Sequence, residues 1–226
     1  YIFSGFPQFA DPQLMTWYLP KLLFRMVASF NAFVISAYVM AACFTYGYVY
    51  KLTQSKVSSL LSGMCFSMSG FFMAHLGHTT IIHAAAWLPL MIWGFEELKR
   101  KFSAKWLVIT ASAVTLCCLA GHSQIFVFSL GLCGLYVLIN AWNTTKDFQW
   151  QYLLRAGFAV LIGALLASIQ LVPSLELSAQ SLRASMDYQA FVSYSLNPGE
   201  IIRLLFPYIF GGLSYLYFGI WGLTET

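Results

Sequence analysis

The stretch VSSLLSGMCFSMSGFFMAHLGHTTIIHAAAWLPLMIWGF, residues 57–95, contains no Asp, Glu, Lys or Arg, and it determines the class of fold. It is too long for one passage through a bilayer, because a helix crosses the ~30 Å hydrocarbon core with about 20 residues. The turn His75-Leu76-Gly77-His78 divides the stretch into two predicted spans. These spans form a helical hairpin whose turn lies at one membrane face.

Other charge-free stretches extend this pattern. Residues 106–145 are divided by a second turn, Gly121-His122-Ser123-Gln124. The last apolar stretch is predicted to stop at Pro173, because proline cannot continue the hydrogen bonding of a helix. The six spans predicted in this way lie near residues 26–50, 57–74, 79–95, 104–120, 125–142 and 152–172.

The composition supports a membrane protein. Of the 226 residues, 59% are hydrophobic and 9% are charged, and the mean hydropathy is +0.71. A soluble domain carries about 25% charged residues, so this chain is predicted to be an all-α polytopic membrane protein. The net charge of +4 is small and favours membrane orientation over nucleic-acid binding. The cysteines form no CxxC motif and are interpreted as helix-packing residues: Cys43, Cys65, Cys117, Cys118 and Cys133.

The basic residues orient the predicted spans. Eight of the twelve lie in or beside alternate connections: Lys51, Lys56, Lys99, Arg100, Lys101, Lys105, Lys146 and Arg155. The positive-inside rule assigns these connections to the cytoplasm. Residues 1–21 then form an extracytoplasmic loop, residues 22–175 a six-helix core, and residues 176–226 an extracytoplasmic or interfacial segment. We interpret the chain as a fragment of a longer polytopic protein.

Three of the four histidines lie at the predicted outer turns. His78 and His122 share the pattern Gly-His-[Ser/Thr]-x-Ile before a helix. The repeat has two readings: ordinary turn chemistry in two similar hairpins, or histidines that, with Gln124, bind a sugar or phosphate at helix N-termini. Zinc binding by His75, His78 and His122 with an acid is a third alternative. His83, one turn inside a span, is predicted to make an interhelical polar contact.

Asp11, in the sequence Ala10-Asp11-Pro12-Gln13, is the only acidic residue before Glu96. A carboxylate in a partly desolvated outer loop can act as a general base or bind a divalent metal. An aspartate before proline is also typical of a turn. The sequence leaves these alternatives open.

Charged residues near the outer ends of the spans complete the candidate site. Lys21 and Arg25 are one helical turn apart and could bind a phosphate, or could extend toward lipid headgroups. Glu176 and Arg183 would share one face if a single helix carried both, as substrate ligands or as a structural ion pair.

The order of several motifs resembles the bacterial YfhO-like membrane proteins, polytopic enzymes of the GT-C glycosyltransferase class. The matching pieces are Ala10-Asp11-Pro12-Gln13, residues 70–90, Gly121-His122-Ser123-Gln124, residues 171–178 with Ser181-Leu182-Arg183, and residues 197–207. The resemblance implies a GT-C fold and transfer of a sugar from a polyprenyl-phosphate donor on the outer face of the bacterial plasma membrane. It also implies that the acid of the first outer loop, here Asp11, is catalytic. The paired acidic motif of that class is absent because Pro12 follows Asp11, so a requirement for a divalent metal stays open.

The sequence therefore favours a membrane glycosyltransferase that acts on a cell-envelope glycan, polymer or lipid. In this hypothesis Asp11 is the base, and the substrate-binding residues are Lys21, Arg25, His75, His78, His122, Gln124, Glu176 and Arg183. Two alternatives are a transporter or flippase of lipid-linked glycans and a non-catalytic membrane subunit. Ion-coupled transport is disfavoured because the spans are nearly free of charge, with Asn31, Asn140 and Gln170 as the main polar exceptions.

Overall fold

The computed structural model describes residues 7–26, 29–142 and 148–181, together with positions 188, 192, 201, 202, 206 and 209. The chain divides into two compact units, residues 1–177 and 178–226. The first unit contains short 3-10 helices at Gln8–Ala10 (η1) and Pro12–Leu14 (η2). Its α-helices are α1 Leu19–Met26, α2 Phe30–Thr53, α3 Lys56–Ser67, α4 Gly70–Ala74, α5 Thr79–Ala86, α6 Leu88–Arg100, α7 Ala104–Leu119, α8 Ser123–Ala141 and α9 Trp150–Ala179, whose last two residues belong to the second unit.

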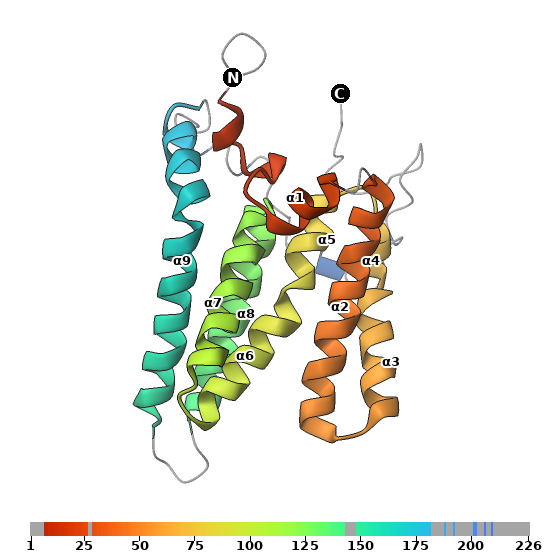
Figure 1. Ribbon diagram of the computed structural model, residues 1–226, viewed down its shortest axis with the longest axis vertical. Helices are drawn as coiled ribbons and strands as arrows, with labels where there is room; N and C mark the ends of the chain where they lie inside the picture. Colours follow the sequence, from red (N-terminus) through yellow and green to blue (C-terminus); the bar gives the residue numbers. More distant parts are fainter. Residues whose placement is uncertain are drawn as a thin grey trace. The chain divides into compact units, whose positions relative to one another are not determined.

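The helices begin where a side chain can bind the free backbone amides of the first turn. Ser29 caps α2, Ser55 caps α3 and Ser103 caps α7, each by accepting a hydrogen bond from a backbone N–H three residues later. Within the first unit, α2, the pair α3 and α4, the pair α5 and α6, and then α7, α8 and α9 run in alternating directions (Figure 1). As a result, the turns before α5 and α8 lie at one end of this unit. The connections after α2 and α6 lie at the other.

Four helical segments are long and apolar enough to cross a membrane: Phe30–Thr53, Lys56–Ala74, Ser123–Ala141 and Trp150–Ala179. They correspond to four of the six predicted spans. Of the other two, α7 is apolar but has 16 residues, and the span expected near residues 79–95 is divided into α5 and α6 at Trp87. The described residues contain no strand, only an isolated bridge between Trp142 and Phe148.

Two predicted boundaries were wrong. The first span does not begin at Met26, because α1 is a separate helix and α2 begins at Phe30. The last helix does not stop at Pro173 but continues to Ala179. The Ser174 hydroxyl lies 2.7 Å from the Gln170 carbonyl and 2.9 Å from the Gln170 amide nitrogen, so side-chain contacts bridge the turn around the proline. Spanning helices tolerate proline where other groups satisfy the backbone nearby.

Close helix packing depends on small residues. The Cα of Gly63 in α3 lies against the backbone carbonyl of Ala42 in α2, and Gly163 in α9 lies against Val114 in α7. Such close approaches are typical of helix interfaces in membranes. The main core cluster includes Tyr18, Phe33, Trp87, Met91, Cys117 and Tyr152. The five cysteines are free; Cys117, Cys118 and Cys133 are buried, in agreement with their predicted packing role, whereas Cys43 and Cys65 are exposed.

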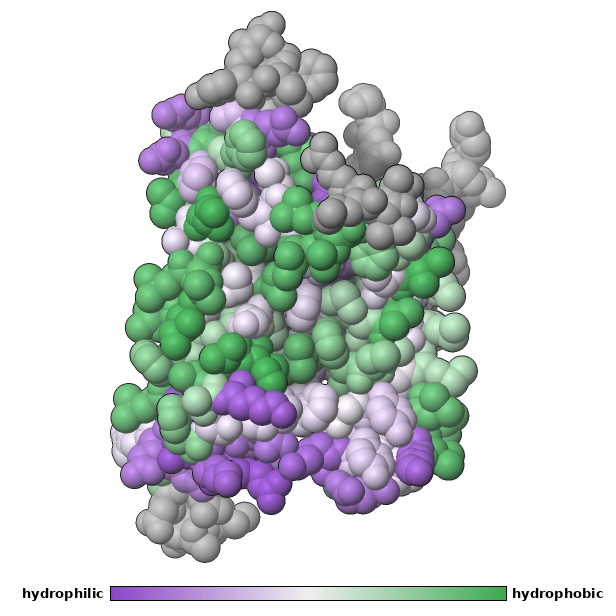
Figure 2. Space-filling view, viewed as in Figure 1, coloured by the Kyte–Doolittle hydropathy of each residue, from purple (hydrophilic) through white to green (hydrophobic). Residues whose placement is uncertain are grey.

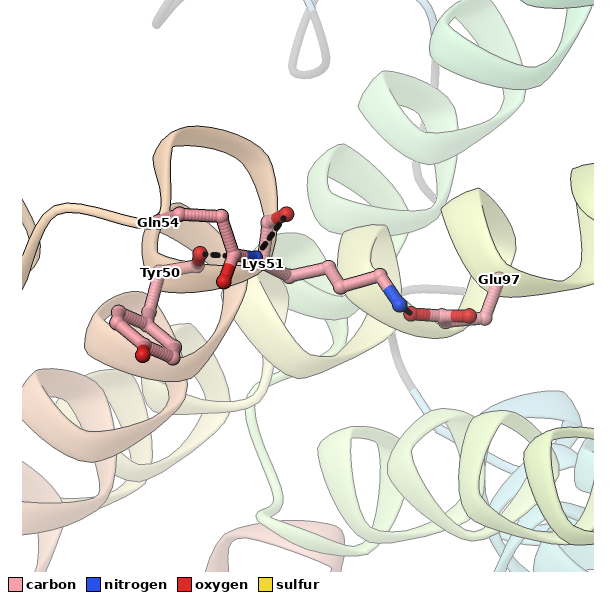
Figure 3. Close-up of polar contacts among 4 residues, drawn as sticks. All are labelled: Tyr50, Lys51, Gln54 and Glu97. Carbon is pink, nitrogen blue, oxygen red and sulfur yellow. Dashed lines mark hydrogen bonds and ion pairs between the residues drawn. The ribbon is translucent and has the colours of Figure 1, made fainter.

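Polar side chains gather at the end of the unit where α2 and α6 end. Figure 2 shows hydrophilic residues at this end of the displayed face and an apolar surface above them. The Lys51 ammonium lies 2.9 Å from the Glu97 carboxylate and joins α2 to α6 (Figure 3). The Lys99 ammonium donates a hydrogen bond to Asn140 (2.9 Å), and the Tyr136 hydroxyl donates one to Glu96 (2.6 Å). The basic residues that predicted the orientation, apart from Lys146, which lies outside the described residues, are therefore at one end of the unit, opposite the histidine turns.

Candidate functional site at the histidine-bearing end

Asp11 has a defined local structure between η1 and η2. Its Oδ1 accepts a hydrogen bond of 2.9 Å from the backbone N–H of Gln13, which caps η2. This is the turn-forming role that the sequence offered as one alternative. The carboxylate is half-buried and receives no other hydrogen bond from the described part of the chain. Its second oxygen thus has acceptor capacity beyond the turn.

The segment that carries Asp11 is held on its N-terminal side by α9. The Gln170 side-chain amide lies 3.2 Å from the carbonyl oxygens of both Phe9 and Ala10, and Gln170 is only 3% exposed. The Ser174 hydroxyl lies 2.8 Å from the same Ala10 oxygen. The backbone immediately before Asp11 is therefore bound to two polar side chains of the last helix.

On the C-terminal side of Asp11, Tyr18 anchors the segment to His83 in α5 and to Trp87, the residue after α5. Nε2 of His83 lies 3.1 Å from the Phe33 carbonyl, which can only accept, so Nε2 carries the proton of a neutral imidazole. Nδ1 is then the acceptor and receives the Tyr18 hydroxyl at 3.1 Å, while that hydroxyl accepts from Trp87 Nε1 at 3.0 Å. All three polar side chains are satisfied inside the core. The predicted interhelical role of His83 is confirmed.

A third contact brings the Asp11 segment against the turn before α8. Gly121 has a φ of +86°, and a Cβ added there would overlap the backbone carbonyl oxygen of Pro12. Only glycine allows both this backbone conformation and this approach. The residue after Asp11 and the residue before His122 are therefore direct neighbours, although more than a hundred positions separate them in sequence.

The two outer turns lie close to each other. The rings of His75 and His78 have centroids 5.9 Å apart. Burial lowers the pKa of His122, and the nearby charges of His75 and His78 lower it further. His122 caps α8, because its Nδ1 accepts from the Ile125 N–H at 3.3 Å. No group of three or more His, Cys, Asp and Glu in the described chain has metal-binding geometry, so the geometry does not support zinc at these histidines.

A cavity of about 290 Å³ lies between η2, α1 and the beginnings of α2 and α5. Its lining combines a cation, hydroxyls and an amide with aromatic and sulfur side chains: Gln13, Met15, Lys21, Phe24, Ser29, Phe30, Phe33 and Thr79. The Lys21 ammonium donates a 2.6 Å hydrogen bond to the Leu14 carbonyl and so also fixes the loop. The cavity therefore brings the Lys21 ammonium close to Gln13, whose backbone N–H donates to Asp11.

The other predicted site residues are either exposed or have side chains outside the described residues. Lys21 and Arg25 both belong to α1, as their spacing predicted, but the side chain of Arg25 lies outside the described residues. Gln124 is exposed in the first turn of α8, and Glu176 is exposed near the end of α9. The helical spacing proposed for Glu176 and Arg183 fails because α9 ends at Ala179; Arg183 itself lies outside the described residues.

Three residues that hold the site in place had no site role in the sequence analysis: Tyr18, Trp87 and Ser174. Gln170 carried a detectable signal, because it is a polar side chain in an otherwise apolar span. Tyr18 and Trp87 carried none, since aromatic residues are common throughout the spans. Their roles depend on contacts across 65 to 69 positions.

The apolar helices and the polar ends define a polytopic α-helical membrane protein. The family model described as the bacterial membrane protein YfhO matches residues 18–221, so the chain belongs to the YfhO family of bacterial membrane proteins. The resemblance noted in the sequence is thereby confirmed. No curated protein and no solved structure matches the chain.

Proposed function

We propose that this protein is a GT-C type glycosyltransferase that moves a sugar from a polyprenyl-phosphate donor to a cell-envelope glycan, polymer or lipid. The reaction takes place on the extracytoplasmic face of the bacterial plasma membrane. The proposal rests chiefly on the Asp11 segment, which Gln170 and Ser174 hold on one side and Tyr18 holds on the other. A loop that served only as a connection would not need to be bound from both sides inside the bundle.

The proposed chemistry is a single inverting displacement. The acceptor hydroxyl attacks the anomeric carbon of the donor sugar, and its proton passes to Asp11. The bond between the anomeric carbon and the phosphate oxygen breaks, and the electron pair leaves with the polyprenyl phosphate. A positioned base contributes roughly 10²–10⁴-fold to such a step, and a nearby cation stabilises the charge that develops on the leaving group.

The binding roles follow the chemistry of each side chain. Lys21 lines the cavity beside Gln13 and contributes positive charge. His75, His78 and His122 at the two turns, with Gln124, orient phosphate or sugar. Arg25, Glu176 and Arg183 stay candidates for substrate contact. A divalent metal at Asp11 would be a further ligand for donor phosphate, and metal dependence stays open.

Transport is less well supported, because none of the main polar residues of the spans, Asn31, Asn140 and Gln170, is placed to form a transport pathway. Asn140 binds Lys99 at the basic end, and Gln170 binds the Asp11 segment. Asn31 is exposed in the first turn of α2. None of these three residues lines the cavity between η2, α1, α2 and α5. None lines the second cavity, which lies among α3, α4, α5, α6 and α8 and is described below.

The proposed function is tested by mass spectrometry of envelope glycans and lipid-linked sugars. Cells that carry the gene, cells that lack it, and cells complemented with Asp11→Asn are compared. The expected result is loss of one glycan modification and accumulation of one lipid-linked sugar in the second and third strains. Unchanged glycans in cells without the gene would overturn the proposal. Glycans restored by Asp11→Asn would leave a non-catalytic role as the explanation.

A further inference from the structure

A second cavity lies among the helices below the histidine turns. It has a volume of about 290 Å³ and is formed by α3 and α4, by α5 and α6, and by α8. Its lining is apolar apart from two serine hydroxyls: Phe66, Ser69, Phe71, Phe72, Ala85, Leu88, Ile125, Phe128, Ser129 and Leu132. We refer to this cavity as the apolar groove.

The apolar groove is directly connected to the histidines. The ring of Phe71, which lines the groove, has its centroid 4.7 Å from the His75 ring, and His75 Nδ1 lies 2.8 Å from the Phe71 carbonyl. Ile125, which lines the groove from α8, donates its backbone N–H to His122. The two outer turns therefore adjoin the groove through Phe71 and Ile125, although no histidine is among its lining residues.

The groove also extends into the membrane region. Leu132 lies nine positions after Ser123, the first residue of α8, which corresponds to a depth of about 14 Å at 1.5 Å per residue. A ligand that fills it must therefore carry an apolar chain, attached to a head that stays at the level of the histidine turns.

The hydrogen-bonding groups of the histidines indicate the chemistry of that head. His122 accepts at Nδ1, so its neutral form carries a proton on Nε2, and this N–H has no partner in the described part of the chain. His78 is exposed and offers a second imidazole at the same turns. Imidazole N–H groups at these turns suit an oxyanion, because phosphate oxygens accept strong hydrogen bonds.

We propose that the apolar groove binds the isoprenoid chain of a polyprenyl phosphate and that His75, His78 and His122 bind its phosphate. This assignment rests on the proposed function, because it locates the lipid of the sugar donor. The groove is a single cavity and so accepts one chain, whereas a phospholipid carries two. Four of the lining side chains are phenylalanines, and their flat rings pack well against the planar, methyl-branched units of an isoprenoid.

The direct test is photocrosslinking of the purified full chain in detergent with a photoreactive farnesyl phosphate analogue. Labelled peptides are identified by mass spectrometry, and no sugar or acceptor is present. Labelling is expected on α4 and on the first half of α8. Unlabelled farnesyl phosphate should suppress it, whereas the two-chain lipid phosphatidylglycerol at the same concentration should not. Equal suppression by phosphatidylglycerol would show a surface for bulk lipid and overturn the proposal.

Two pairs of variants separate the chain from the head. Leu132→Trp fills the groove, and Leu135→Trp, also exposed but outside the groove lining, is its matched control. Leu132→Trp should lower labelling by both farnesyl phosphate and the uncharged farnesol analogue. The double variant His78→Gln, His122→Asn should lower labelling by farnesyl phosphate alone, by roughly 10- to 100-fold. The assignment would be refuted if Leu132→Trp and Leu135→Trp lowered labelling equally. It would also be refuted if the double histidine variant were labelled by farnesyl phosphate as strongly as the unchanged protein.

Failure of the proposed function would look different. If farnesyl phosphate labels the groove as expected but envelope glycans do not depend on the gene, the binding site stands and the transferase does not. If glycans depend on the gene and on Asp11 but labelling falls elsewhere, the transferase stands and the groove does not hold the donor.

Discussion

The Cα of Gly121 lies against the backbone carbonyl of Pro12, and this contact joins the turn before α8 to the segment that carries Asp11. The contact needs both the positive φ of Gly121 and the absence of a Cβ. It connects the residue after the proposed base directly to the residue before His122. Its disruption should therefore affect both stability and activity.

Gly121→Ala tests this connection. A left-handed alanine costs about 1–2 kcal/mol, and its Cβ would also displace the Pro12 carbonyl. We expect the apparent Tm in detergent to fall by roughly 4–8 °C and glycan product per inserted protein to fall with it. Gly131→Ala in α8, where a Cβ meets nothing within 4 Å, is the control and should lower neither quantity. A Gly121→Ala protein with normal Tm would contradict the close packing.

Asp11→Asn removes the proposed base but keeps the turn, because an asparagine oxygen can still accept from the Gln13 N–H. Product per unit of membrane-inserted protein should fall roughly 10²–10⁴-fold, with protein abundance unchanged. The comparison variant is Asp11→Ala, which loses the cap as well and should also reduce abundance. If Asp11→Asn retains near-normal product at normal abundance, Asp11 is not the catalytic base.

Tyr18→Phe tests the anchor on the other side of the segment. The change leaves the Nδ1 of His83 and the indole N–H of Trp87 buried without partners. An unsatisfied buried polar group costs about 1–3 kcal/mol, so the apparent Tm should drop clearly. Tyr46→Phe is a suitable control, since the hydroxyl of Tyr46 has no hydrogen bond within the described residues. Equal melting temperatures for the two variants would argue against the network.

The His122 cap should make stability depend on pH. Burial and the neighbouring histidines hold the pKa of His122 below its ordinary value of 6.5, so the unfolded chain binds the proton first as pH falls. The contribution of His122 is therefore complete above about pH 6.5 and declines as the pH drops toward its lowered folded-state pKa. Protonation of Nδ1 also removes the acceptor for the Ile125 N–H. His122→Asn retains a cap but does not titrate, so its Tm should fall less between pH 7.5 and pH 5.5, values about one unit to either side of the ordinary histidine pKa of 6.5.

Cysteine labelling tests the orientation. In a background without the five native cysteines, Gln180→Cys should react with an impermeant reagent in intact cells. Lys101→Cys, in the connection between α6 and α7, should react only after permeabilisation. Both side chains are exposed on the protein, so a difference in their labelling would reflect the side of the membrane and not burial. The reverse pattern would place the histidine turns in the cytoplasm and remove the basis for an extracytoplasmic site.

Most of the helical framework could be predicted from the sequence, because membrane thickness sets the length of a charge-free stretch. The span expected near residues 125–142 is α8, Ser123–Ala141, and the one near 26–50 is α2 apart from its start. The division at Trp87 and the continuation through Pro173 were not predicted. The division coincides with Pro89 in the first turn of α6, a signal that the predicted spans did not take into account, whereas the continuation through Pro173 depends on contacts of Ser174 with Gln170 and with the Ala10 carbonyl.

The candidate site was predictable as a list of residue types but not as an arrangement. His83 was correctly assigned to interhelical bonding because a lone histidine within a span needs a partner. The bonds from Gln170 to the Phe9 and Ala10 carbonyls could not be foreseen. Those partners are backbone groups, which every residue possesses, so their positions leave no mark on the sequence.

The bonds between Gln170 and the Asp11 segment also have a consequence for biosynthesis. The segment leaves the ribosome well before α9, because Gln170 lies 160 and 161 positions after its partners Ala10 and Phe9. Domains otherwise tend to fold from the N-terminus during synthesis. The Asp11 loop must therefore wait for α9 to be inserted before it can take its final shape. A nascent chain that stalls before α9 would carry the proposed base in an unfixed loop, so catalytic competence would mark the completion of the bundle.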